Sequence, residues 1–263
     1  LDNGGHIVFD LGPQPQTIVL DQQLMVTRDV LLDGGNLVTL SGGDSVRVLW
    51  VQRPWNPADA YTARLQRLRI VDGRTPVGAG SLPDNSGAGV LVAGDGAWQA
   101  VSLEVVGCTF EDNTAVDIHQ DGGGGAIYVL GGDSLVIVDS VFDHNAGSNG
   151  GAVYSLGARE VLISGSLFND NTATGFGANP GNGGNAGALG VDGAERTVDV
   201  CGTVFSNNTC NAHGCGDFSG AYDEISRNDF ESCAFIGNTN PTDDHHTGAM
   251  YLQGSPFALT GCT

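Results

Sequence analysis

Short apolar runs alternate with glycine-rich polar breaks along the whole chain. The N-terminal runs are Ile7–Phe9, Thr17–Leu20, Val30–Leu32, Leu37–Leu40 and Val46–Trp50. Runs of this length between glycine-rich breaks predict β-strands joined by tight turns. Residues 53–62 interrupt the pattern and predict an excursion at the surface, with Asn56 and Pro57 typical of the start of a short helix.

From residue 65 onward the pattern becomes a repeat of two phrases. The aromatic phrase, Phe-x-x-Asn, occurs at Phe110/Asn113, Phe142/Asn145, Phe168/Asn171, Phe205/Asn208 and Phe235/Asn238. The small phrase, Gly-Ala, occurs at Gly125, Gly151, Gly187, Gly220 and Gly248. By subtraction, successive phenylalanines are 32, 26, 37 and 30 residues apart. A repeat in this range indicates a stacked array, in which each unit buries its apolar face against its neighbours.

The two distances within the repeat behave differently. From the alanine of Gly-Ala to the next phenylalanine there are 16, 16, 17 and 14 residues, whereas from phenylalanine to the next Gly-Ala there are 15, 9, 19, 15 and 13. The constant part predicts a coil of three short strands per rung, and the variable part predicts loops on one side. We therefore expect an all-β, right-handed parallel β-helix that forms one domain over 1–263, less regular over 1–64 and regular over 65–263.

The repeated residues have architectural explanations. The phenylalanines should stack inside the coil, with Ile70 as an early counterpart and Gly73 at the place of the later asparagines. We expect each asparagine to adopt the left-handed backbone of a sharp corner and to hydrogen-bond to the asparagine one rung away. The glycine of Gly-Ala fits a place where a side chain would collide with the returning loop.

These paired phrases resemble those of the chlamydial polymorphic outer-membrane proteins and related bacterial surface proteins. The resemblance covers about residues 65–263 and implies the fold of the pectin-lyase-like β-helices. In such proteins the two phrases are architectural, so the resemblance transfers no catalytic residue. Lyases on this fold generally use an arginine or lysine as base, often beside Ca²⁺.

Charge narrows the range of partners. The formal net charge is −20, and all ten basic residues are arginines, seven of them at or before Arg74. Such an acidic surface repels nucleic acid and anionic lipid, and it opposes a polyuronate unless bound calcium reverses the local charge. No apolar run reaches the 18 to 20 residues or so that a membrane span needs.

The loops between the two phrases contain the candidate chemistry. In Asp117-x-His119-x-Asp121 alternate residues of an extended segment would point the same way, so this is the best local candidate for a metal or acid/base site, with Asp117 and Asp121 as calcium ligands. Asp243 and His245 are further catalytic candidates. The candidate ligand-binding residues are His213, Asp217, Asp244 and His246. The competing interpretation is that these side chains belong to solvated loop surface.

Six cysteines without a Cys-x-x-Cys pair favour disulfides in an oxidising compartment. Cys210 and Cys215 could close a small ring within one loop. Cys233 and Cys262 should lie on adjacent rungs, although Cys201 is an alternative partner for Cys233, so the connectivity stays open. Trp50, Trp55 and Trp98 could stack on sugars or could cover an end of the coil.

Two hypotheses follow. The first is a secreted or cell-surface β-helix that is a structural, adhesive or ligand-presenting module, with a polysaccharide or another surface protein as partner. The alternative is a polysaccharide lyase or hydrolase with its site in the stacked loops. The chain stops at Cys262-Thr263, within a repeat, so we expect its open ends to be covered by further chain, by self-association or by a capping partner.

Overall fold

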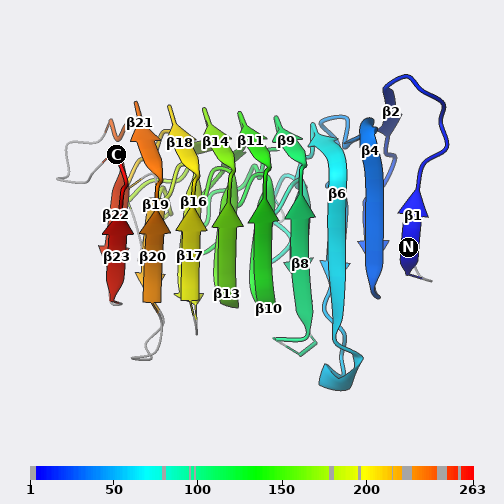
Figure 1. Cartoon of the computed structure of the whole chain (residues 1–263), viewed down its shortest axis with the longest axis horizontal. Coiled ribbons are helices and arrows are strands. Elements are labelled where there is room, and N and C mark those ends of the chain that lie inside the picture. The colour runs from blue at the N-terminus through cyan, green and yellow to red at the C-terminus, as the bar shows by residue number, and fades with distance from the viewer. Residues whose placement is uncertain are drawn as a thin grey trace.

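The computed structural model is a right-handed parallel β-helix, as the repeat predicts (Figure 1). It describes residues 4–78, 81–94, 96–97, 99–177, 181–194, 197–214, 216–220, 227–241, 248–253 and 256–263. Every strand pairs in parallel with the equivalent strand of the next rung, for example Phe110 with Phe142 and Phe142 with Phe168. Figure 1 shows the rungs side by side from β1 at one end to β22 and β23 at the other.

Three columns of strands make up the coil. The first column consists of β3 (Leu24–Val26), β5 (Leu49–Gln52), β7 (Val90–Ala93), the first parts of β10 (Ile127–Val138) and β13 (Val153–Ser164), β16 (Leu189–Ala194), β19 (Gly216–Gly220) and β22 (Met250–Gln253). The second consists of β1 (Gly5–Val8), the first parts of β4 (Val30–Ser41) and β6 (Tyr61–Val71), β8 (Val101–Val106), the later parts of β10 and β13, β17 (Thr197–Cys201), β20 (Arg227–Glu231) and β23 (Phe257–Thr260).

The third column carries the phenylalanines. It consists of β2 (Gln16–Val19), the later parts of β4 and β6, β9 (Thr109–Glu111), β11 (Val141–Asp143), β14 (Leu167–Asn169), β18 (Val204–Ser206) and β21 (Ala234–Ile236). The remaining elements are β12 (Ala146–Gly147), β15 (Thr172–Ala173) and the 3₁₀ turn η1 (Pro57–Asp59). Within the described residues, no helix is long and apolar enough to cross a membrane.

Between β5 and β6 the chain leaves the ladder over residues 53–60, and this segment lies at the foot of β6 (Figure 1). The excursion expected over 53–62 is shorter in the structure, because Tyr61 and Thr62 already belong to β6. Asn56 caps η1, and its side chain accepts a hydrogen bond from Ala58 N at 3.0 Å. One detail differs from the expected pattern of turns. Three separate short strands per rung are expected, but in β10 and β13 the first two strands of the rung are continuous, and Gly132 pairs with Ala158 within the ladder.

The interior confirms the phenylalanine ladder. The five rings stack in sequence with centroids 4.9, 4.6, 5.0 and 4.8 Å apart. Ile70 pairs with Phe110 and so extends the ladder toward the N-terminus, as expected. One continuous apolar core runs from Val26 to Cys233.

The asparagine prediction is right about hydrogen bonding and wrong about the backbone. Side-chain amides link Asn113, Asn145, Asn171, Asn208 and Asn238 in turn, with Nδ2–Oδ1 distances of 3.0, 3.0, 2.9 and 2.9 Å. The left-handed corner belongs to the residue before each asparagine. Because the preceding residue forms the corner, each asparagine side chain can point inward and hydrogen-bond to both adjacent rungs.

The glycine of Gly-Ala lies where the next rung passes closest. A Cβ on Gly125 would lie 2.5 Å from Gly151 O, and one on Gly151 would lie 2.3 Å from Gly187 O. The expected collision is therefore confirmed, although the obstructing atoms are backbone oxygens of the adjacent rung and its loop.

Candidate functional site

The loop around Asp117, His119 and Asp121 is held by hydrogen bonds within the loop and to neighbouring rungs. Asp117 Oδ1 accepts from Gly78 N at 3.1 Å, and His119 Nδ1 accepts from Asp121 N at 3.0 Å. The latter bond closes a local turn, and residues 117–121 form no strand. Among the described residues, these three do not form a group with ligand atoms close enough together to share a metal ion.

The other predicted loop residues are only partly described. The His213 ring stacks on Tyr251 with a centroid separation of 4.3 Å. Asp217 lies in β19, but its side chain is outside the described part of the structure. Asp243, Asp244, His245 and His246 also lie outside the described residues.

The predicted disulfide between Cys233 and Cys262 is wrong for this structure, because both are free thiols, as is the alternative partner Cys201. The spacing of adjacent rungs, about 4.8 Å, lies within the range of Cα separations that a disulfide spans, so rung geometry by itself neither requires nor excludes the bond. The other pair, Cys210 with Cys215, cannot be placed because Cys215 lies outside the described residues.

A ladder of small side chains explains the cysteines two residues before the phenylalanines. Ser140 Oγ occupies this place one rung after Cys108 and donates to Val138 O at 2.8 Å. Cys108 and Cys233 use their thiols in the same way, each pointing to the carbonyl two residues earlier at 3.6 and 3.5 Å. Burial raises the pKa of each of these two thiols to about 11. They therefore behave as small core residues.

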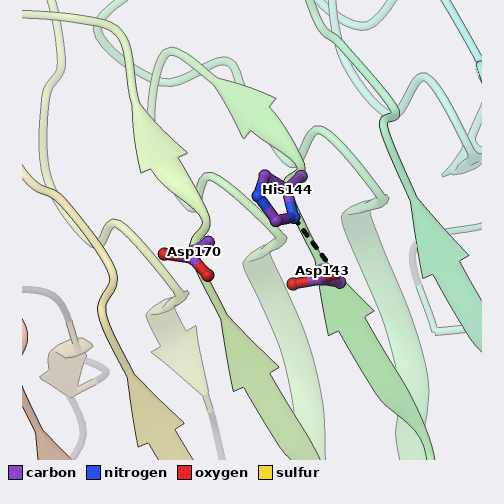
Figure 2. A group of neighbouring side chains, drawn as sticks. All are labelled: Asp143, His144 and Asp170. Atoms are coloured by element: carbon purple, nitrogen blue, oxygen red, sulfur yellow. Dashed lines mark ion pairs between the residues drawn. The ribbon is translucent and has the colours of Figure 1, made fainter.

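A cluster of metal-ligand type forms at the corner after the phenylalanine strands. Asp143 ends β11, His144 follows it, and Asp170 follows β14 on the next rung. One ligand atom from each lies within 4.8 Å of the others, which is true of no other three-residue group among the described residues. Figure 2 shows His144 beside Asp143, to which it is ion-paired, with Asp170 on the neighbouring rung.

Backbone conformation puts two of these side chains in one column. His144 and Asp170 have φ of 54° and 51°, and Asp112 and Asn207, at the same place in adjacent rungs, both have φ of 55°. Asp143 belongs to the neighbouring column, where it pairs with Asn169. The sequence contains this signal, since aligning the Phe-x-x-Asn phrases places Asp112, His144 and Asp170 in register. Treating the phrase as purely architectural missed it.

The surroundings of the corner raise the pKa values of two of its side chains, His144 and Asp112. The hydrogen bond with Asp143 raises the pKa of His144 above its ordinary value, and the charges of Asp143, Asp170 and Asp112 add to this effect. Burial raises the pKa of Asp112, and the charge of Glu111 adds to it. Like-charged carboxylates at rung spacing repel one another, so a cation is favoured at this corner.

A second feature is a hollow near the N-terminal end, with a volume of about 620 Å³. Its lining includes Thr27, Arg28, Asp29 and Asp59. Trp55, next to the lining residue Pro54, has 81% of its surface exposed. The hollow therefore combines hydrogen-bonding groups with a nearby exposed aromatic face.

Two of the three tryptophans named as a sugar-stacking surface or an end cover, Trp50 and Trp55, lie within the described residues. Trp50 donates its indole N–H to Ala93 O at 3.0 Å and packs in a small apolar cluster with Leu91 and Tyr128. Trp98 lies outside the described residues. Only Trp55 keeps its ring available to a ligand in the described part of the chain.

Part of the chain matches a known family of repeats. Residues 107–130 match the Chlamydia polymorphic membrane protein repeat. The matched stretch contains Phe110 and Asn113, and it ends within β10 after the Gly-Gly-Ala phrase. No curated protein and no solved structure matches the chain.

Proposed function

We propose that this chain is a cell-surface β-helix that serves as a structural and adhesive module and presents a ligand-binding surface. The observation that carries the proposal is the match of residues 107–130 to the repeat of a membrane protein family. The strong net negative charge is compatible with an extracellular surface and disfavours nucleic acid as a partner.

The repeated residues support a scaffold role. Asn145 and Asn171 are almost completely buried, and their side chains bond to neighbouring rungs of the coil. Phe142 and Phe168 are fully buried between the rings of adjacent rungs. Because these groups are enclosed and their bonds are made within the coil, recognition belongs to other parts of the surface.

The ligand that we propose is a carbohydrate bound at the N-terminal hollow. Sugar rings have apolar faces that pack on aromatic side chains, and the exposed ring of Trp55 offers such a face. Arg28, Asp29 and Asp59 in the hollow can exchange hydrogen bonds with sugar hydroxyls. The acidic surface favours neutral or basic sugars over polyuronates.

A glycan array tests this proposal with three proteins: the unaltered chain, Trp55→Ala, and Phe176→Ala as control. Phe176 is another exposed aromatic residue, 55% exposed, in the loop that bridges to Asn182. We expect the unaltered chain and the control to bind the same glycans and Trp55→Ala to lose them. Binding that is unchanged in Trp55→Ala, or no binding to any glycan, would overturn the carbohydrate proposal.

The enzymatic alternative is tested separately. Incubation with a polysaccharide panel, with and without Ca²⁺, would reveal unsaturated uronate products from a lyase or new reducing ends from a hydrolase. We expect neither product. Cleavage at a steady rate that scales with protein concentration would replace the adhesive module with an enzyme.

A further inference from the structure

The corner formed by Asp143, His144 and Asp170 is a place where two rungs contribute side chains to one small volume. Asp143 Oδ2 and His144 Nδ1 are already 3.0 Å apart. Ligands around a four-coordinate transition metal with bonds of about 2.0–2.1 Å lie roughly 3.3 Å from one another. The third ligand, an Asp170 carboxylate oxygen, lies within 4.8 Å of the other two ligand atoms, and a modest side-chain rotation would bring it closer.

The hydrogen bonds around the cluster hold its carboxylates in place. Asn169 Nδ2 donates to Asp143 Oδ1 at 2.9 Å and to Asp170 Oδ2 at 2.6 Å, and so joins the two candidate ligands. Asn169 is itself fixed by Ser206, whose hydroxyl donates to Asn169 Oδ1 at 2.7 Å. Such outer contacts orient ligating carboxylates at metal sites.

Charge at the corner is a second, separate observation that points to a cation. Asp112, Asp143 and Asp170 lie on three successive rungs, and none of them is paired with an arginine among the described ion pairs. Arg69, which lies on the preceding rung opposite Thr109, is bonded to Glu111. The single imidazole of His144 is the local counter-charge to three carboxylates, and a divalent cation would balance them more fully.

We propose that Asp143, His144 and Asp170 form a binding site for a divalent transition-metal cation such as Zn²⁺ or Mn²⁺. An imidazole nitrogen beside two carboxylates suits these ions, whereas Ca²⁺ and Mg²⁺ prefer sites made only of oxygen ligands. Water would complete the coordination, because the cluster faces solvent. The ion would join adjacent rungs and place a positive charge on an otherwise acidic ridge.

The coil supplies its own conservative substitutions for the test. Asn207 holds the left-handed position of His144 and Asp170 on a later rung, with φ of 55°. Asn169 holds the position of Asp143 one rung on. The variants His144→Asn, Asp143→Asn and Asp170→Asn therefore introduce a residue that the fold already accepts there, and circular dichroism would verify the fold of each.

The experiment is calorimetric titration of the chelator-treated chain with ZnCl₂, together with NMR observation of the His144 ring during addition of MnCl₂. We expect each of the three variants to weaken the tightest zinc site about tenfold or more. The matched control Asp112→Asn removes one nearby charge but no ligand. It should therefore change the affinity of that site by only about twofold, well under the tenfold change that corresponds to about 1.4 kcal/mol.

Two results would overturn the site. One is zinc binding with the same stoichiometry and affinity in the unaltered chain and in His144→Asn, which would assign the metal to other histidines. The other is a His144 ring signal that MnCl₂ broadens no more than the signal of His119. Preferential broadening at His144 that disappears in Asp143→Asn would establish it.

Discussion

Replacing Asn171 with alanine should remove one link of the buried ladder. Its side chain makes four hydrogen bonds: Oδ1 accepts from Asn145 N and Nδ2, each at 3.0 Å, and Nδ2 donates to Phe142 O and Asn208 Oδ1, each at 2.9 Å. At about 1 kcal/mol of net stability each, these four bonds sum to about 4 kcal/mol.

Some partners keep other bonds, which lowers this figure. Asn145 Nδ2 still donates to Phe110 O, and Asn208 Oδ1 still accepts from the backbone of residue 171. The Asn145 N–H, however, loses its side-chain acceptor in a fully enclosed place. We therefore expect Asn171→Ala to lower the free energy of unfolding by about 3 kcal/mol.

Asn238→Ala is the matched control because Asn238 is the last asparagine of the ladder. It is only half-buried, so water can replace part of what the substitution removes, and we expect a loss of about 1 kcal/mol. Urea unfolding followed by circular dichroism gives both values, with hydrogen exchange to report local opening, since solenoids need not unfold in one step. Equal losses at the two positions would refute the reasoning from burial.

Three further predictions concern other parts of the coil. Gly151→Ala should destabilise the fold by about 2–3 kcal/mol in urea unfolding, because the new Cβ meets backbone atoms that cannot yield, and a neutral effect would contradict that geometry. Iodoacetamide at pH 8, read by peptide mass spectrometry, should label exposed Cys201 quickly and buried Cys108 slowly, and the reverse order would contradict the burial. The pKa of His144 is raised in the folded state, so its pairing with Asp143 stabilises the fold by less than about 1 kcal/mol at pH values below the ordinary histidine pKa of about 6.5. This stabilisation is lost as the pH rises through the raised pKa of His144. The variant His144→Asn should lack this pH dependence of the free energy of unfolding.

The sequence was sufficient to predict the coil because the largest and the smallest side chains determine how adjacent rungs align. Phe110 and Phe142 must face inward at matched places, and Gly125 must lie where another rung passes, so the two phrases determine the direction and spacing of the strands. These are consequences of side-chain volume, which a single sequence displays directly.

The details that sequence reasoning missed depend on which of two neighbouring residues carries a constraint. The asparagine was expected to occupy the left-handed corner, but its inward hydrogen bonds need an ordinary backbone there, and the corner passes to the residue before it, such as His144. The metal-ligand cluster was missed for the same reason, because His144 is one of the two variable residues of Phe-x-x-Asn and no role was assigned to that position. Rung spacing made a pairing of Cys233 with Cys262 look favourable, but both thiols are free in the structure.

The hydrogen-exchange rates of four backbone amides test most directly whether the repeated phrase is the internal scaffold of the coil. The N–H groups of Asn113, Asn145, Asn171 and Asn208 each donate to the side-chain oxygen of the next asparagine, at 3.2, 3.0, 3.0 and 2.9 Å. NMR measurement of exchange in D₂O should place these four amides among the slowest to exchange in the chain, with similar exchange rates. Exchange of these four amides as fast as that of the loop residues 117–121 would contradict the ladder and the scaffold role built on it.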